Sequence, residues 1–181
     1  MVSRLVPPNL VVGEFRLRPF RREDADAWYG YLCDPRVTEH TSWPPITREF
    51  IDALVEKVID DYDDLASLRW ALARQDDDRL VGSCGYPRLF SERHAAELAY
   101  DLAPAYWRRG IMSSAVSAVV DWAFRIGSLS RVEAFVMTTN EPSISLLERA
   151  GFKKEQLFKG HRLARGVPRD FFLYSIESHA G

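Results

Sequence analysis

Alternating apolar and polar positions predict seven strands along the chain. Phe15–Arg18 alternates strictly and stops at Pro19, which cannot donate to a sheet ladder. Three longer runs follow with only short turns between them: Leu68–Arg74, Leu80–Leu89 and Ala96–Leu102. Parallel crossovers need about a dozen residues, so these three runs are expected to form an antiparallel meander. The remaining strands are predicted near Arg131–Thr138, Phe152–Phe158 and Phe171–Ile176.

Apolar residues at helical spacing predict four helices between these strands. The first covers Glu23–Leu32. Thr47 can cap the second, whose apolar stripe is Ile51, Leu54, Val55, Val58 and Ile59. The third follows Pro104, and its buried face carries Ile111, Ala115, Val119 and Trp122. Asn140 caps the fourth helix, which ends at Gly151.

A meander followed by strand, helix, strand and helix predicts an α+β layered domain with a mixed sheet. The chain has 181 residues, close to the size of one domain, and no repeat, low-complexity tract or linker interrupts it. We therefore expect a single domain over residues 1–181. Apolar residues make up 46% and charged residues 28% of the chain, which excludes wholesale disorder.

Charge, cysteine and histidine content exclude several classes of function. The net charge is −2, so no overall field draws the protein to nucleic acid or to an anionic membrane. Cys33 and Cys84 are isolated, which excludes a disulfide scaffold and indicates a cytoplasmic protein. The four histidines lack metal-ligand spacing, so we expect no metal. No apolar run reaches the roughly 18 residues of a membrane span, and the N-terminus lacks the apolar core of a signal peptide.

The segment Leu102–Ser114 joins a predicted strand to a predicted helix and concentrates features that bind phosphate. The first amides of a helix lack intrahelical partners, and the helix dipole adds about half a positive charge there. Arg108 and Arg109 add two charges, and Gly110 lets the backbone approach a ligand closely. Two interpretations remain open from these residues alone: a pyrophosphate cradle, or an ordinary solvated strand-to-helix turn.

Four motifs in sequence order resemble one family. Tyr106–Met112 resembles the Q/R-x-x-G-x-G/A pyrophosphate loop of the GNAT acyltransferase superfamily. Together with Ala96–Leu102 it is similar to the RimJ/RimL-like branch, the ribosomal-protein N-acetyltransferase type. Asn140–Phe152 matches the N-x-x-S-x-x-L-x-x-x-G-F helix of that branch in spacing, and Phe15–Pro19 and Arg169–Tyr174 resemble its first and last strands. The resemblance covers about residues 14–178.

This resemblance implies a GNAT-like three-layer fold, with helices on both faces of a mostly antiparallel sheet. It implies an N-acetyltransferase that uses acetyl-CoA and no metal. The acetyl group would pass to a primary amine, either a protein N-terminus or a small molecule, by direct attack within a ternary complex. The residues implied in binding acetyl-CoA are Leu102, Trp107, Arg108, Arg109, Gly110, Ile111, Met112, Ser113 and Asn140.

Catalysis of this kind needs a base for the amine and an acid for the departing thiolate. The resemblance implies Glu97 as the base and a backbone amide near Leu102 as a donor to the developing oxyanion. Leu147 stands where many members carry the tyrosine that acts as acid, which makes Ser143 the next candidate. Each has a structural alternative: Glu97 as a solvent-facing strand carboxylate, and Ser143 as a helix cap. No acyl-cysteine is expected, because neither cysteine lies beside a histidine in sequence.

The acceptor pocket is expected between the first two helices and the last hairpin, where Trp43, Tyr31 and Tyr86 would contact the substrate. Aromatic residues at such places also fit core positions. A loop over residues 159–168 would shape the pocket. The acidic run Asp60–Asp64 favours a cationic acceptor if it lies near the mouth. Amino acids, polyamines and antibiotics compete with protein N-termini as acceptors.

Two other classes of function compete with an enzyme. A CoA-binding sensor or interaction module without catalysis fits the absence of tyrosine at position 147. A DNA-binding protein would use residues 101–181, which hold 11 basic and 8 acidic residues, whereas residues 1–100 hold 13 and 18. These basic residues do not share one helix face, which argues against DNA. Superfamily members are often dimers, although no feature of this sequence demonstrates a homodimer.

Overall fold

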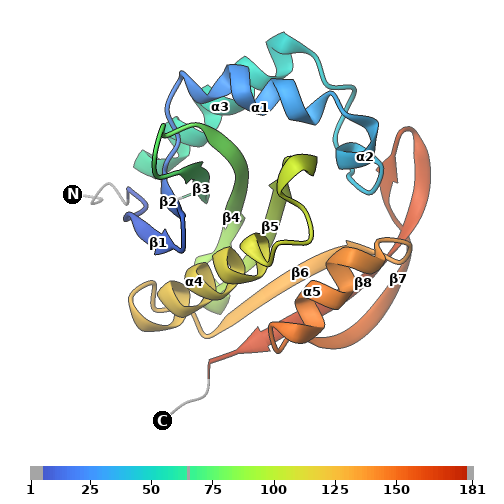
Figure 1. Cartoon of the computed structure of the whole chain (residues 1–181). Helices are drawn as coiled ribbons and strands as arrows, with labels where there is room; N and C mark the ends of the chain where they lie inside the picture. Colours follow the sequence, from blue (N-terminus) through green and yellow to red (C-terminus); the bar gives the residue numbers. More distant parts are fainter. Residues whose placement is uncertain (1–5, 65, 179–181) are drawn as a thin grey trace.

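An eight-stranded mixed sheet forms the centre of the molecule (Figure 1). The computed structural model describes residues 6–64 and 66–178. The strand order is β1-β2-β3-β4-β5-β6-β8-β7, and the β5–β6 pair is parallel while the other neighbours are antiparallel. The strands are β1 Leu10–Val12, β2 Phe15–Pro19, β3 Leu68–Arg74, β4 Leu80–Phe90, β5 Ala95–Leu102, β6 Arg131–Met137, β7 Lys153–Ala164 and β8 Val167–Glu177.

Helices cover both faces of this sheet, which confirms the layered α+β fold. They are α1 Asp24–Leu32, α2 Pro35–Thr38, α3 Arg48–Asp64, α4 Ile111–Arg125 and α5 Glu141–Arg149. Successive strand residues point to opposite faces. Trp70 contacts Trp122 of α4, with ring centroids 5.2 Å apart, whereas the neighbouring Arg69 lies over Trp28 of α1. The face of α4 is therefore opposite the face of α1 and α3.

Local sequence signals fix the helix starts as predicted. The hydroxyl of Thr47 accepts a hydrogen bond from the Phe50 amide at 3.1 Å, and the side chain of Asn140 accepts one from the Ser143 amide at 3.2 Å. The meander β3–β4–β5 is also confirmed. No helix in the described residues is long and apolar enough to cross a membrane.

Two parts of the sheet differ from the prediction. The sequence predicts seven strands, but the three-residue edge strand β1 is too short to show alternation and leaves Val11 77% exposed. The predicted loop over 159–168 is mostly strand, since β7 runs to Ala164 and β8 begins at Val167. Gly160 reads as a turn residue, but its φ of +57° lies at a register shift inside β7.

Candidate active site

The parallel strands β5 and β6 separate partway along the sheet. They pair only from Ala95 with Arg131 to Glu97 with Glu133. Farther along, β5 continues beside β4 while β6 turns away (Figure 1). The Ala103 amide donates to a β4 carbonyl at 2.8 Å, and antiparallel bonding alternates, so the peptide groups of Tyr100 and Leu102 face the opening between β5 and β6. A ligand in this opening can meet main-chain groups that the sheet does not use.

The turn before α4 presents further main-chain donors. Arg108 and Gly110 have left-handed backbones, with φ of +59° and +72°. The first α4 amide bonded within the helix belongs to Ser114, which donates to the Gly110 carbonyl at 3.1 Å, and Gly110 gives no side-chain cap. The amides of residues 111–113 therefore point along the helix axis toward the turn. A Cβ at Gly110 would meet no heavy atom within 4 Å, so the space beside the Gly110 backbone is open.

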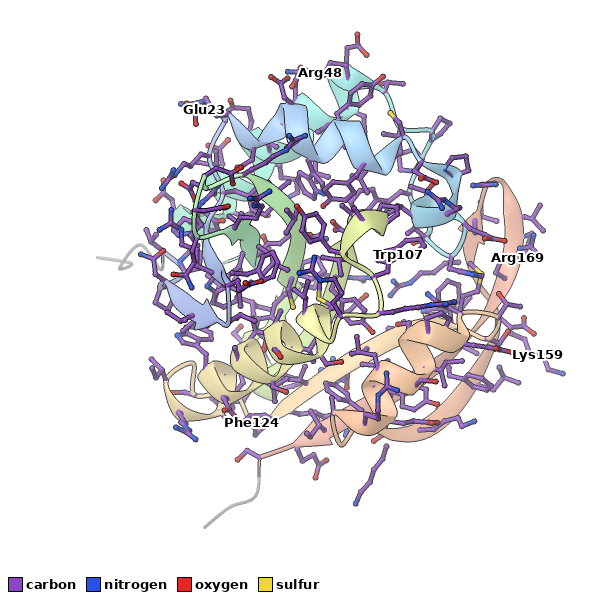
Figure 2. The ribbon with its side chains drawn as sticks, viewed as in Figure 1. Glu23, Arg48, Trp107, Phe124, Lys159 and Arg169 are labelled. Carbon is purple, nitrogen blue, oxygen red and sulfur yellow. The ribbon has the colours of Figure 1, made fainter. Side chains whose placement is uncertain are left out.

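Side chains around this turn brace it rather than close it. Trp107, 38% exposed and central in Figure 2, donates its indole N–H to the Leu102 carbonyl at 2.7 Å. Arg109 lies over the Tyr106 ring and 3.8 Å from Glu14, and Arg108 is exposed. The side chains of Ile111 and Met112 are buried, so these two residues offer only their backbone to a ligand. The turn combines amide donors with two cationic groups, which suits a pyrophosphate.

Ser143 lies at the start of α5 and hydrogen-bonds across to β5. Its Oγ is 2.6 Å from the hydroxyl of Tyr100, which belongs to the separated part of that strand. Asn140, not Ser143, is the cap of α5. Burial raises the pKa of Tyr100, so its hydroxyl stays neutral. Tyr100 was not predicted from the sequence, although strand alternation places it on the face opposite Asp101, where α5 lies.

Comparison with known proteins identifies the family. Residues 14–153 match the acetyltransferase (GNAT) domain. The chain belongs to the GNAT acetyltransferase family. An uncharacterized N-acetyltransferase, p20, of Bacillus licheniformis is 32% identical over 173 residues, which cover 93% of this chain and 95% of that protein. The ribosomal protein uS5-alanine N-acetyltransferase of Escherichia coli is 28% identical over 102 residues, 56% of this chain and 53% of its own length.

Solved structures agree with the family at the level of the fold. The RimL ribosomal L7/L12 α-N-protein acetyltransferase, solved with coenzyme A, superposes with a TM-score of 0.88 at 19% identity. The match covers 96% of this chain and all of that one (100%). Together with the family match and the uS5-alanine relative, this fold confirms the RimJ/RimL-like resemblance of the sequence, and this GNAT chain is an N-acetyltransferase.

Glu97 of this GNAT protein lies where the two strands part, but it is not solvent-facing. Its side chain is only 6% exposed, and a different guanidinium holds each carboxylate oxygen. Arg88 is 3.0 Å from Oε2, and Arg162 is 2.9 Å from Oε1. The carboxylate is thus ion-paired with two cations, one of which, Arg162, also donates a hydrogen bond to it, and this differs from the arrangement expected of a base with a free oxygen. The pairing of Glu97 with these arginines was not predicted from the sequence, because Arg162 is 65 residues from Glu97.

A second buried carboxylate, Asp101, lies at the centre of a group of hydrogen-bonded side chains, the Asp101 wall. It accepts hydrogen bonds from Arg69 at 2.8 Å, from Ser83 at 2.5 Å, from the indole of Trp28 at 3.2 Å and from the hydroxyl of Tyr31. Burial, followed by the charge of Asp101, raises the pKa of Tyr31 well above its usual value. Arg69 and Asp101 compensate each other's charge, so this wall is neutral overall.

The three aromatic residues predicted to contact the acceptor lie in different surroundings. Tyr31 belongs to the Asp101 wall, and Trp43 is partly buried with its ring 5.7 Å from the Arg69 guanidinium. Tyr86 is fully buried on the α4 face, where its hydroxyl donates to the Val119 carbonyl at 2.8 Å. Its side chain is therefore part of the core on the face opposite Asp101, and it cannot reach an acceptor bound beside Tyr31.

The acidic run at residues 60–64 lies at the end of α3. α3 runs from the side of α2 toward β2 and β3 and ends there (Figure 1). Near that end, Tyr62 donates to the Arg69 carbonyl and accepts from the Phe20 amide, while Asp61 pairs with Lys57 and Ser67. Tyr62 thus joins the end of α3 to Arg69, whose side chain bonds Asp101, and the condition for a cationic acceptor stays a prediction.

Two other kinds of chemistry, an acyl-cysteine at Cys84 and a bound metal ion, are not indicated by the residues that the structure describes. Cys84 is fully buried, and burial raises the pKa of its thiol. No group of three His, Cys, Asp or Glu side chains that could hold a metal ion occurs within residues 6–64 and 66–178.

Proposed function

We propose that this protein binds acetyl-CoA in the opening between β5 and β6 and transfers the acetyl group to a primary amine within a ternary complex. Acetyl-CoA would supply a thioester carbonyl to the attacking amine. The observation that carries the proposal is that two sets of main-chain groups are used neither by the sheet nor by α4, those of Tyr100 and Leu102 in the opening and the amides of residues 111–113 at the start of α4. The open space at Gly110 fits the pyrophosphate.

The chain's residues then divide into three roles. Arg108, Arg109 and the amides of Ile111, Met112 and Ser113 hold the diphosphate, and Trp107 braces their turn through Leu102. Asn140 and Ser143 begin α5 beside the opening, and the Ser143 hydroxyl, held by Tyr100, is a hydrogen-bond donor to the departing sulfur. The coenzyme A in the RimL structure supports the choice of ligand.

The proposed role of Glu97 differs from that of a general base with a free oxygen. Both its oxygens are held by arginines, so we propose that it orders Arg88 and Arg162 beside the acceptor and reaches the amine only through water. Tyr31 and Trp43 form the acceptor wall across from it. The acceptor is a protein N-terminus or a small amine. The relation to the uS5-alanine acetyltransferase supports a protein N-terminus.

The extent of the sheet and of the family match bears on the domain organisation. The sheet spans residues 10–177 and the family match covers 14–153, which supports one N-acetyltransferase domain over residues 1–181. A cytoplasmic location and a homodimer stay predictions of the sequence.

Two measurements test the proposal together. Calorimetry with acetyl-CoA measures binding, and thiol release in the presence of a mixed amine and peptide panel measures transfer. We expect binding with acceptor-dependent thiol release. Binding without release on any amine would instead favour the sensor, an alternative to which buried Leu147 and doubly paired Glu97 give some support. No binding at all would overturn both.

A further inference from the structure

Arg88, Glu97 and Arg162 form a cluster on the acceptor face that carries excess positive charge. The two arginines contribute two charges, and the carboxylate between them cancels only one. Glu97 is 6% exposed and Arg162 is 23% exposed, whereas Arg88 is 57% exposed and reaches solvent. Glu97 and Arg162 thus hold the cluster in place, and the second positive charge is accessible to a ligand of opposite sign.

The geometry leaves donors available on both arginines. The Arg162 guanidinium lies over the rings of Phe135 and Phe171, with its Cζ 4.7 Å and 5.8 Å from the ring centroids. A stacked guanidinium presents its N–H groups only in its own plane. Nη2 of Arg162 donates to Glu97, so the remaining N–H groups of this guanidinium are available to another acceptor. Arg88 holds Glu97 from the other side and is 57% exposed.

The nearest carboxylates on the neighbouring strands have cationic partners of their own. Glu133, in register with Glu97 on β6, lies 2.8 Å from Arg131 and 3.4 Å from Arg93. Asp101, on the neighbouring wall, is matched by Arg69. Desolvation, followed by the charge of Arg162, lowers the pKa of His161, so this imidazole is neutral at pH 7. His161 stacks on Phe135 at 4.6 Å and adds an apolar surface beside the arginines.

We propose that Arg88 and Arg162 form an anion-binding subsite of the acceptor pocket, so that the favoured acceptor is an amine that also carries a carboxylate or a phosphate. This inference rests on the proposed function, because it assigns the acceptor to this face. A cationic acceptor would meet the same two arginines with like charge, and a planar guanidinium edge matches both anions in geometry.

The test compares tripeptide amides that differ only at the second residue, each with a free N-terminal alanine and a blocked C-terminus. The second residue is glutamate, phosphoserine, glutamine or lysine. We expect the glutamate or phosphoserine peptide to exceed the glutamine peptide by at least about fivefold in kcat/KM, mainly through KM, and the lysine peptide to be the poorest. The relative rates of the two anionic peptides show which anion fits. The preference should shrink in high salt, because the pairs are partly exposed.

Arg88→Gln and Arg162→Gln should reduce that preference to less than about twofold. Arg93→Gln is the matched control. Arg93 is 56% exposed and pairs at 3.4 Å with the buried Glu133, and it should keep the full preference. An unchanged preference in both Arg88 and Arg162 variants, or equal rates on glutamate and glutamine peptides, would overturn the subsite.

Peptide binding by calorimetry, with and without saturating CoA, reads the subsite independently of turnover. Tighter binding of the anionic peptides without thiol release would support the subsite while the proposed transfer fails. Thiol release with no charge preference in rate or binding would sink the subsite and leave the transfer standing.

Discussion

Gly110 is the residue on which the proposed cofactor turn depends most directly. Its φ of +72° is a backbone conformation that residues with side chains rarely adopt, and nothing occupies the place of a Cβ. The sequence marks this glycine, because its position between two arginines and a helix predicts a close approach of the backbone. The left-handed Arg108 is not marked in the same way, since arginine usually avoids a φ of +59°.

Replacing Gly110 by valine tests this residue against a matched glycine. Gly166, in the β7–β8 turn, has a φ of +76° and equally open space. Gly110→Val and Gly166→Val should each lower the free energy of unfolding by about 1–2 kcal/mol, because both strain the backbone. Only Gly110→Val should weaken acetyl-CoA binding, by about tenfold or more, since its side chain enters the space of the diphosphate. Urea unfolding and calorimetry measure the two effects, and equal CoA affinity in both variants would refute the assigned turn.

Partners of single residues are the part of the site that sequence reasoning missed. Spacing and resemblance selected Glu97 and Ser143, but not what holds them. Arg162 and Tyr100 come to these residues from 65 and 43 positions away along the chain. Such contacts depend on how strands are ordered and how far a hairpin bends, and no local periodicity contains that information.

At the scale of elements, one hydrogen bond connects α5 to the free part of β5. Tyr100 and Ser143 lie 2.6 Å apart on the face that the proposed sulfur position shares. Since Tyr100 stays neutral, its hydroxyl can orient that of Ser143, which in the proposed mechanism is the group that would contact the sulfur. The pair should therefore act as one unit.

Tyr100→Phe and Ser143→Ala test that unit. Each should lower kcat about tenfold or more with little change in the KM for acetyl-CoA, because the donor serves the departing sulfur. The double variant should be no slower than the slower single variant, since both remove the same donor. Tyr174→Phe is the control, because it deletes another tyrosine contact to α5, the 2.8 Å bond to Glu148, away from the opening. Multiplying effects in the double variant, measured by thiol release, would show that the two hydroxyls act separately.

Elements were predictable where local pattern and tertiary packing agree. The α4 stripe through Ile111, Ala115 and Val119 is buried as predicted, and the meander has short connections that permit one pairing. The predicted strand ends at Phe158, earlier than β7 does, because Lys159-Gly160 has turn composition. In the structure Gly160 lies within β7, and its amide donates to the Asp170 carboxylate at 2.8 Å. A bulge and a turn look alike in sequence, because both use glycine with positive φ.

Across the whole molecule, Asp78 ties the β3–β4 turn to β2 and to the approach to α1. Its carboxylate bonds Arg18 at 2.7 Å and Arg16 at 2.8 Å, and Arg21 at 2.5 Å, with its own φ at +58°. In the sequence, Asp76-Asp77-Asp78 reads as the solvated tip of a hairpin. The structure distinguishes Asp78, 25% exposed, from Asp77, 48% exposed, because only Asp78 faces the arginines of β2.

Asp78→Asn should therefore make stability depend on pH in a defined direction. Burial alone would raise the pKa of Asp78, but the hydrogen bonds from Arg18 and Arg16 outweigh it and lower the pKa from 3.8 to about 2. A depressed native pKa stabilises the fold above the unfolded value and loses that contribution as pH falls through the native one. The variant should be about 2 kcal/mol less stable at pH 7. The difference should close between about pH 4 and pH 2, because protonated aspartate and asparagine are then similar.

Asparagine also tolerates the left-handed backbone, so strain adds little to the effect of Asp78→Asn. Asp77→Asn should change stability by less than about 0.5 kcal/mol at either pH. Urea unfolding at pH 7, 4 and 2.5 measures these differences, and a gap for Asp78→Asn as large at pH 2.5 as at pH 7 would show that its role is steric rather than electrostatic.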